Sequence, residues 1–268
     1  MRIVKRHNFF KKFEREVYWF LKEKLNIKDF LIYDVKILKE NEKLIKDFLE
    51  KRERGYPFQY IVGNVEFFGE KILVEEGVFI PRPETEILVE EAINLLKDKK
   101  ELIGLDLCCG SLNIGIVLCK YLDIKRLYAV DISEKAIKIS KKNLHIHNLK
   151  EKICLIRADL LEAFTKKEIF DFICANPPYV ATSELGSLQK EITYEPIKAF
   201  IGGKDGLDVI KKIIFQSYDL LKKEGYLICE IGHKHSSELS KILKKLSYSK
   251  FWFKKDFQDI DRILILQK

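Results

Sequence analysis

From Leu102 to the end of the chain, short apolar runs alternate with segments whose apolar residues recur at helical spacing. Such runs are typical of strands in a mostly parallel sheet, because helices cover both of its faces. We expect strands at 102–107, 126–131, 152–157, 169–175 and 225–231, with further candidates near 249–255 and 261–267. We expect helices at 113–121, 133–146, 205–223 and 236–247. The alternation therefore predicts an α/β fold.

The first part of the chain has a different pattern. Residues 9–25 and roughly 34–50 carry apolar side chains at helical spacing, and Gly55-Tyr56-Pro57 punctuates their end. Residues 58–80 are rich in β-branched and aromatic side chains interrupted by glycines, which is typical of a β-hairpin. These patterns predict a small helical region followed by a hairpin that joins two parts of the chain.

A stiff extended link, Pro81-Arg82-Pro83, follows the predicted hairpin. Glu84-Thr85-Glu86 then opens a helix to about Lys97, with acidic residues well placed in its first turn. The resulting division is a helical domain at 1–55, a β-hairpin linker at 56–83 and a larger domain at 84–268.

Composition limits the environment and the chemistry. No run approaches the roughly 18–20 apolar residues that span a bilayer, and residues 1–12 are basic without the apolar stretch of a signal peptide. We therefore expect a cytoplasmic protein with no membrane partner. Without a C-x-x-C pair, we expect reduced core thiols and no metal site. The six cysteines are Cys108, Cys109, Cys119, Cys154, Cys174 and Cys229.

The net charge of +8 is concentrated early in the chain. Residues 1–54 hold 16 lysines and arginines against 10 acidic residues. Such a basic face could meet RNA or an acidic protein surface, or it could be a solvated, lysine-rich helical surface. The charge alone leaves these alternatives open.

Two loops follow the first two predicted strands at the edge where open α/β sheets bind ligands. The first is Leu105–Leu112, which offers backbone N–H groups to a small polar ligand. Asp131 ends the second strand about 20 residues later, where a carboxylate can accept hydrogen bonds from both ribose hydroxyls. Only Gly110 remains of the three glycines of a dinucleotide fingerprint, and there is no phosphate loop. The spacing fits a nucleoside-type ligand, or Asp131 could be a plain helix N-cap or turn residue, with Ser133 competing for the cap.

Asp159 follows the third predicted strand. A carboxylate or backbone amide there could contact an adenine edge, or it could cap a loop.

The most specific local feature is Asn176-Pro177-Pro178-Tyr179, directly after the apolar strand 169–175. Prolines lack an N–H and cannot continue a strand, so the strand ends with Asn176 at its carboxyl tip. A planar amide or aromatic amine is a poor nucleophile, because its nitrogen lone pair is delocalised. The Asn176 side-chain oxygen and the Pro177 carbonyl could hold its two hydrogens and stabilise the positive charge that builds during methyl transfer. Tyr179 could pack flat against the planar group.

Asn-Pro-Pro-Tyr in this place is typical of amino-group methyltransferases, including those that modify adenine in DNA or guanine in ribosomal RNA. Further motifs make the chain resemble the HemK/PrmC family over roughly residues 52–268. They are Gly55-Tyr56-Pro57, Gln59-Tyr60-Ile61, Gly63, Glu66-Phe67, Gly69, Pro81 through Glu86, Glu195-Pro196, Gly202-Gly203, Asp205 through Asp208, Glu230 through His233, Lys255-Asp256 and Ile260-Asp261-Arg262.

The resemblance implies a protein-glutamine N5-methyltransferase that acts on the Gly-Gly-Gln loop of class 1 peptide-chain release factors. It implies a Rossmann-like, seven-stranded class I methyltransferase domain and a small N-terminal helical domain that helps hold the release factor. The implied cofactor is S-adenosylmethionine, which leaves as S-adenosylhomocysteine. We expect a monomer that does not require direct nucleic acid binding.

The resemblance also implies roles for individual residues. The cofactor is expected at Asp106, Cys108, Cys109, Gly110, Ser111, Leu112, Asp131, Ile132, Asp159, Leu160 and Asn176. The substrate is expected at Asn176, Pro177, Pro178, Tyr179, Arg82, Pro83 and Glu84, of which Asn176, Pro177 and Tyr179 are the expected catalytic residues.

The first loop departs from the family pattern. Cys108 and Leu112 carry side chains where glycines are usual, so we expect a slightly different loop path. Leu160 stands where an aromatic residue often flanks the adenine, which reduces the stacking area.

Two alternative functions use the same features. A nucleic-acid amino-methyltransferase would need the same pocket for an exocyclic amine, with a basic channel and stacking aromatics beside it. A non-catalytic adaptor would have kept the fold while its altered loop lost the cofactor. The segment Pro81 through Glu86 favours a protein substrate.

Overall fold

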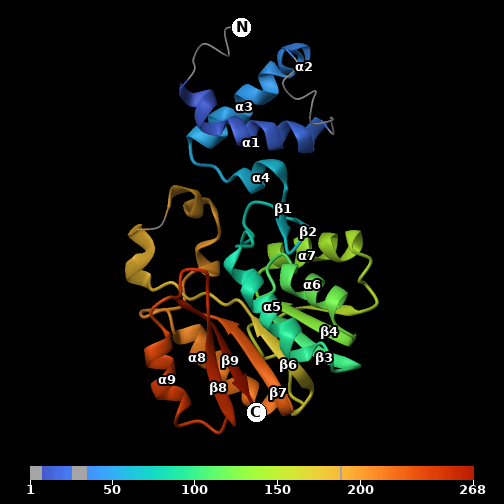
Figure 1. The fold of residues 1–268 in the computed structure, drawn as a ribbon, viewed down its shortest axis with the longest axis vertical. Helices are drawn as coiled ribbons and strands as arrows, with labels where there is room; N and C mark the ends of the chain where they lie inside the picture. Colours follow the sequence, from blue (N-terminus) through green and yellow to red (C-terminus); the bar gives the residue numbers. More distant parts are fainter. Residues whose placement is uncertain (1–7, 26–34, 188) are drawn as a thin grey trace. The chain divides into compact units, whose positions relative to one another are not determined.

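A computed structural model describes residues 8–25, 35–187 and 189–268 (Figure 1). The chain forms two compact units. The first comprises Met1–Asn64 together with Gln189–Tyr194, and the second comprises Val65–Leu188 together with Glu195–Lys268.

Helices build the first unit. They are α1 (Asn8–Leu25), α2 (Val35–Glu40), α3 (Glu42–Glu53), α4 (Phe58–Val62) and the 3-10 helix η3 (Lys190–Tyr194). The rings of Phe20 and Phe48 stack with their centroids 4.4 Å apart, and Leu21 and Ile45 are buried beside them. Arg52 is buried and pairs with Glu16. The pattern at roughly 34–50 forms two helices rather than one, and residue 34 lies outside the described residues.

The β-hairpin predicted at 58–80 is shorter than expected. Residues Phe58–Val62 form α4, and only β1 (Asn64–Phe67) and β2 (Glu70–Leu73) pair as strands. The apolar residues of α4 pack on the helical core, and Gly63 ends the helix in the left-handed conformation at φ +89°. Packing therefore overrides the β propensity of this segment.

A seven-stranded sheet forms the centre of the second unit, in the order β5-β4-β3-β6-β7-β9-β8. Strands β3 through β7 are parallel, whereas β9 runs antiparallel to both β7 and β8. This arrangement confirms the predicted α/β fold. The strands are β3 (Leu102–Leu107), β4 (Ile124–Asp131), β5 (Ile153–Arg157), β6 (Phe170–Ala175), β7 (Leu221–Glu230), β8 (Lys250–Lys255) and β9 (Asp261–Gln267).

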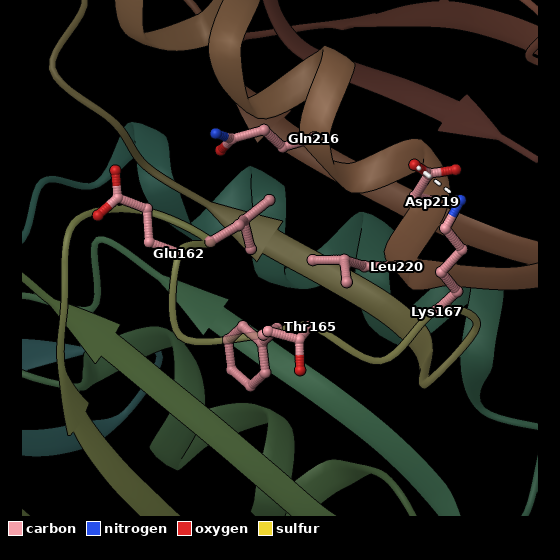
Figure 2. Close-up of a pocket in the computed structure, with 8 residues that line it drawn as sticks. Glu162, Thr165, Lys167, Gln216, Asp219 and Leu220 are labelled. Atoms are coloured by element: carbon pink, nitrogen blue, oxygen red, sulfur yellow. Dashed lines mark ion pairs between the residues drawn. The ribbon is translucent and has the colours of Figure 1, made fainter.

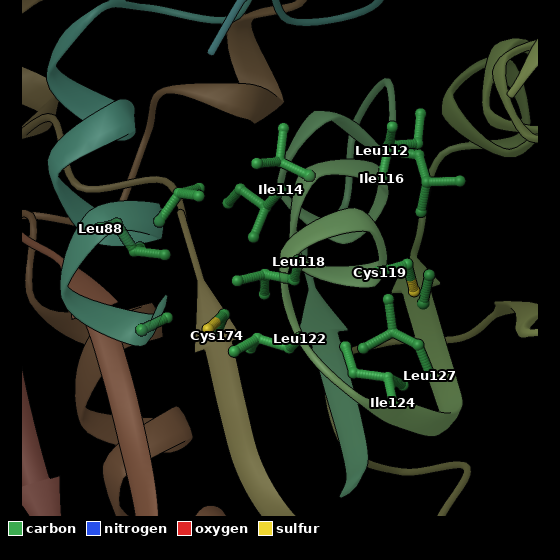
Figure 3. Close-up of a cluster of buried hydrophobic side chains, with 14 of the residues drawn as sticks. Leu88, Leu112, Ile114, Ile116, Leu118, Cys119, Leu122, Ile124, Leu127 and Cys174 are labelled. Carbon is green, nitrogen blue, oxygen red and sulfur yellow. The ribbon is translucent and has the colours of Figure 1, made fainter. Parts of the chain in front are cut away.

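Helices cover both faces of this sheet (Figure 1). One buried cluster joins α5 (Glu84–Leu96), α6 (Asn113–Tyr121) and α7 (Glu134–Ile146) to one face. Figure 3 shows part of it, with Leu88 and Leu118 near Cys174 of β6. The other cluster packs α8 (Asp208–Leu220) and α9 (Ser236–Leu243) on the opposite face.

Two segments of the second unit differ from the prediction. Helix α8 ends at Leu220 and β7 begins at once, so this strand starts four residues before the predicted 225. Pairing of Phe170 with Leu221 and an ion pair between Lys222 and Asp171, at 2.8 Å, extend the sheet there. The connection after β6 contains unpredicted 3-10 helices, η2 (Thr182–Ser187) and η4 (Ile197–Ala199).

Candidate active site at the carboxyl edge of the sheet

The strand order reverses between β3 and β6, which is where open α/β sheets bind ligands. Strands β4 and β5 lie in turn on one side of β3, whereas β6 lies on its other side and is followed by β7. Leu107 and Ala175 are register partners at the ends of these parallel strands. The loop that begins at Cys108 and the tip residue Asn176 therefore leave the sheet side by side, at the same edge.

The loop after β3 keeps glycine-like torsions despite its side chains. Cys108 and Leu112 have φ values of +59° and +71°, and Gly110 has a φ of +53°. The backbone therefore holds these side chains in the left-handed region, at a cost of order 1–2 kcal/mol per residue. Complete burial of Leu112 offsets that cost with apolar contacts.

Polar contacts from α7 and β4 hold this loop in place. Ser140 donates from Oγ to the Gly110 carbonyl at 2.8 Å, and Asn143 donates from Nδ2 to the Ser111 carbonyl at 2.8 Å. The Asp131 carboxylate accepts from Gly110 N at 2.9 Å and from Ser133 N at 2.8 Å. Sequence reasoning missed Ser140 and Asn143, because their partners lie about 30 residues earlier in the chain with no local pattern.

The contacts of Ser133 show which residue caps α7, and Asp131 itself accepts from Ser133 N as a turn residue does. The Ser133 side chain accepts from Ala136 N and caps α7, so Asp131 is not the cap residue. Asp131 instead stands at the end of β4 with its carboxylate against the loop, and burial raises its pKa. Each carboxylate oxygen has a second lone pair for a ligand hydroxyl.

Two buried polar atoms, one on β3 and one in the loop that follows it, lack partners. Among the described residues, Asp106 Oδ1 and Ser111 Oγ are the buried side-chain oxygens without a hydrogen bond. The other Asp106 oxygen accepts from Gly115 N at 2.9 Å. Space is open above Gly110, where an added Cβ would have no atom within 4 Å. A buried carboxyl oxygen and a buried hydroxyl without partners fit S-adenosylmethionine, which carries an ammonium group and ribose hydroxyls.

We expect Asp106→Asn to flatten the pH dependence of stability. Burial raises the pKa of Asp106 from 3.8 to about 8. The folded chain therefore binds the proton more tightly than the unfolded chain, and this group's contribution to stability is lost as the pH rises from about 4 to 8. The loss reaches at most about 1.4 kcal/mol per pH unit.

Urea unfolding of wild type and Asp106→Asn at pH 6 and pH 8 measures this difference. The free energy of unfolding should fall more between the two pH values in the wild type than in the variant. Equal falls would show that Asp106 does not titrate in this range.

The tip of β6 is tied to two other segments by a chain of hydrogen bonds. Asn176 donates from Nδ2 to Thr85 Oγ1 at 3.0 Å, and Thr85 donates from Oγ1 to Glu230 Oε2 at 2.7 Å. Tyr179 donates its hydroxyl to Glu230 Oε1 at 2.9 Å. Thr85 and Glu230 are buried, Pro177 is buried, and Asn176, Pro178 and Tyr179 are half-buried. The tip is thus held from α5 and β7.

The motifs that resemble the family include Thr85, Glu230 and Glu195, but sequence reasoning gave these residues no separate role. Glu230 could have been recognised from the sequence, because it is a carboxylate inside the apolar run Leu227–Ile231. A carboxylate buried with that run needs hydrogen-bond or ion-pair partners. Burial raises the pKa of Glu230, whereas the two hydroxyl donors lower it.

Arg82 forms an ion pair with an acidic side chain that is distant from it in the sequence. Its guanidinium pairs with Glu195, whose second oxygen accepts from Ile80 N at 2.8 Å. Glu195 is only 4% exposed, and burial raises its pKa against the lowering effect of Arg82. Pro83 and Glu84 are exposed at the start of α5.

The remaining predicted cofactor residues follow β4 and β5. Ile132 and Asp159 are exposed, and Leu160 is half-buried against the second core cluster with φ +45°. Figure 2 shows a separate cavity of about 300 Å³ on the α8 side, between the segment 161–167 and the end of α8. None of the predicted site residues lines it.

Two kinds of feature are absent from the part of the chain that the structure describes. No helix there is long and apolar enough to cross a membrane. No group of three histidine, cysteine or acidic side chains among the described residues could hold a metal ion.

Comparisons with known proteins identify the family of this chain. Residues 75–198 match the family model described as methyltransferase small domain. The release factor glutamine methyltransferase of Thermodesulfovibrio yellowstonii is 39% identical over 87% of this chain and 84% of the relative. The protein of the same name from Clostridium acetobutylicum is 37% identical over 82% of this chain and 78% of the relative.

A solved structure shares the fold. The catalytic domain of human Mettl16, in complex with MAT2A 3'UTR hairpin 6, has a TM-score of 0.57 at 20% identity, and the match covers 74% of this chain and 76% of that chain. At that identity the likeness shows the fold alone. The sequence relatives show more, because they are similar over most of both chains. The chain belongs to the release factor glutamine methyltransferase family, whose members are S-adenosylmethionine-dependent enzymes.

Proposed function

We propose that this chain methylates the side-chain amide nitrogen, N5, of the glutamine in the Gly-Gly-Gln motif of class 1 release factors. The observation that carries the proposal is the position of Asn176, beside the loop after β3 at the same edge of the sheet. The names of the relatives support release factors as the substrate class.

The residues at the tip suit an amide acceptor. The Asn176 side-chain oxygen and the Pro177 carbonyl accept the two N–H hydrogens of the glutamine amide, and Tyr179 contacts its flat face. These contacts hold the nitrogen in line and stabilise the positive charge that develops on it. When bound, S-adenosylmethionine would supply the electrophilic methyl group and leave as S-adenosylhomocysteine, and the methylated nitrogen would then release one proton to solvent. The residues Asp106, Cys108 through Leu112, Asp131, Ile132, Asp159 and Leu160 would hold it.

We assign the first helical region, residues 1–55, to holding the release factor, and residues 56–83 to linking it to the methyltransferase domain at 84–268. The basic balance of residues 1–54 supports a partner with an acidic surface. The proposed substrate acts in translation, so we place the chain in the cytoplasm, where it would act as a monomer.

Asp131→Ala should weaken S-adenosylmethionine binding by roughly 1.5–3 kcal/mol, about 10- to 150-fold in Kd, because charge-assisted hydrogen bonds to the ribose are lost. Calorimetric titration measures the change. Glu134→Ala, which removes an exposed carboxylate on the next helix, is the matched control and should bind like wild type. An unchanged Kd for Asp131→Ala would remove Asp131 from the cofactor site.

A methylation assay with labelled S-adenosylmethionine tests the proposed function. The acceptors are a purified class 1 release factor, its loop variant with Gln→Ala, ribosomal RNA and DNA. We expect label in the intact release factor alone. Label in RNA or DNA instead would favour the nucleic-acid alternative, and no cofactor binding at all would favour the non-catalytic adaptor.

A further inference from the structure

We infer that Thr85 and Glu230 are positioning residues that decide which end of the Asn176 amide faces the substrate. The inference rests on the proposed function, because it concerns how Asn176 receives the glutamine. Its basis is the direction of the hydrogen bonds that link Asn176, Thr85 and Glu230.

Thr85 has one hydroxyl proton to donate. Its Oγ1 lies 2.7 Å from Glu230 Oε2, and a carboxylate can only accept, so that proton is given to Glu230. Toward Asn176 the same oxygen must therefore act as an acceptor. It lies 3.0 Å from Asn176 Nδ2, which is the donor end of the amide.

This direction leaves the acceptor end of Asn176 for the substrate. A glutamine amide offers two N–H donors at the nitrogen that receives the methyl group, so it needs acceptors opposite it. If the Asn176 side chain were reversed, its NH2 group would face the glutamine NH2 group, and neither could accept. The Thr85 and Glu230 pair therefore selects the productive orientation.

Burial makes the selection strong. Thr85 and Glu230 are each 1% exposed, so water cannot replace a lost partner. Turning Asn176 around would place its oxygen against Thr85 Oγ1. Thr85 could then donate to Asn176 only by leaving Glu230 Oε2 without its donor, which is costly for a buried carboxylate.

The Glu230 carboxylate also fixes Tyr179, at the other end of the segment Asn176–Tyr179. Glu230 Oε1 accepts the Tyr179 hydroxyl at 2.9 Å, so Glu230 holds Tyr179 directly and Asn176 through Thr85. Burial raises the pKa of Glu230, whereas the Thr85 and Tyr179 hydroxyls and the charge of Arg262, which is itself paired with Asp256 at 3.1 Å, favour its ionised form. Glu230 thus orients the two polar side chains that flank the twin prolines.

Two conservative variants test the inference through kcat. Thr85→Val keeps the shape of the side chain but removes the hydroxyl, so kcat on the release factor should fall by about 30- to 100-fold, less than the roughly 100- to 1,000-fold for a direct contact at the reacting centre. Thr85→Ser restores the hydroxyl and should recover most of that loss. The KM for the release factor and the Kd for S-adenosylmethionine should stay within about twofold of wild type, because Thr85 is buried and out of reach of either ligand.

Glu230→Gln provides an independent test if Thr85→Val does not fold. The amide introduced by this substitution can keep an oxygen for Tyr179 while presenting its NH2 group to Thr85. The Thr85 hydroxyl would then donate toward Asn176 and favour the reversed Asn176 amide. We expect a similar fall in kcat with a native thermal unfolding curve.

The buried hydroxyl of Ser217, which contacts Tyr248 away from the site, gives a matched control. Ser217→Ala should leave kcat unchanged. The inference is overturned if Thr85→Val keeps wild-type kcat, or if Thr85→Ser loses as much as Thr85→Val. A wild-type chain that fails to methylate the release factor would instead contradict the proposed function.

Discussion

Replacing Asn176 with alanine should lower kcat for release factor methylation by at least about 100-fold, with little change in S-adenosylmethionine binding. The variant removes the side-chain acceptor that we propose holds one hydrogen of the glutamine amide. It leaves the loop after β3 and Asp131 in place, and these make up most of the proposed cofactor site. The interaction is made mainly as charge develops, so kcat should fall more than KM rises.

Single-turnover methylation and calorimetric titration of the same preparation measure both quantities. Asn64→Ala is the matched control, because Asn64 is an asparagine of the hairpin that contacts Glu23 and no site residue. Wild-type kcat in Asn176→Ala would refute the role of Asn176. An equal loss of cofactor binding would mean that the variant damaged the donor loop instead.

Arg82→Ala should lower the free energy of unfolding by about 2–3 kcal/mol. Its guanidinium pairs with Glu195, which is buried and would be left without a cation. Breaking a fully buried pair typically costs about 3–5 kcal/mol, and the partial exposure of Arg82 reduces this figure. The loss should be largely recovered in the double variant Arg82→Ala with Glu195→Gln, because the stranded charge is then removed.

Urea unfolding of the wild type, both single variants and the double variant measures the free energy of unfolding of each, and thus the coupling between the two side chains. Additive losses in the double variant would show that the two side chains do not stabilise each other. The double variant also separates two roles of Arg82. A direct contact with the substrate would raise the KM for the release factor even where stability is recovered.

The sheet and the placement of the site followed from local patterns. Short apolar runs alternating with helices are enough to predict parallel strands, and residues directly after such strands must lie at one edge. Asn176 and Asp131 were placed by that rule alone. The pattern failed at Phe58–Val62, where packing on the helical core favours a helix over the strand that β-branched and aromatic residues suggest.

The supporting contacts could not be predicted, because they join distant parts of the chain. Asn176 and Thr85 are 91 residues apart, Thr85 and Glu230 are 145 apart, and Arg82 and Glu195 are 113 apart. No periodicity or spacing rule reports such pairs from a single sequence. The torsions at Cys108 and Leu112 were also missed, since left-handed backbone at residues with a Cβ depends on surrounding packing.

A crystal structure of the chain with S-adenosylhomocysteine and a peptide containing Gly-Gly-Gln tests the central claim most directly. We predict that the glutamine amide nitrogen lies within hydrogen-bond distance of Asn176 Oδ1 and the Pro177 carbonyl, and faces the sulfur of the product. A glutamine bound away from the β6 tip, or a sulfur at the other edge of the sheet, would contradict the account.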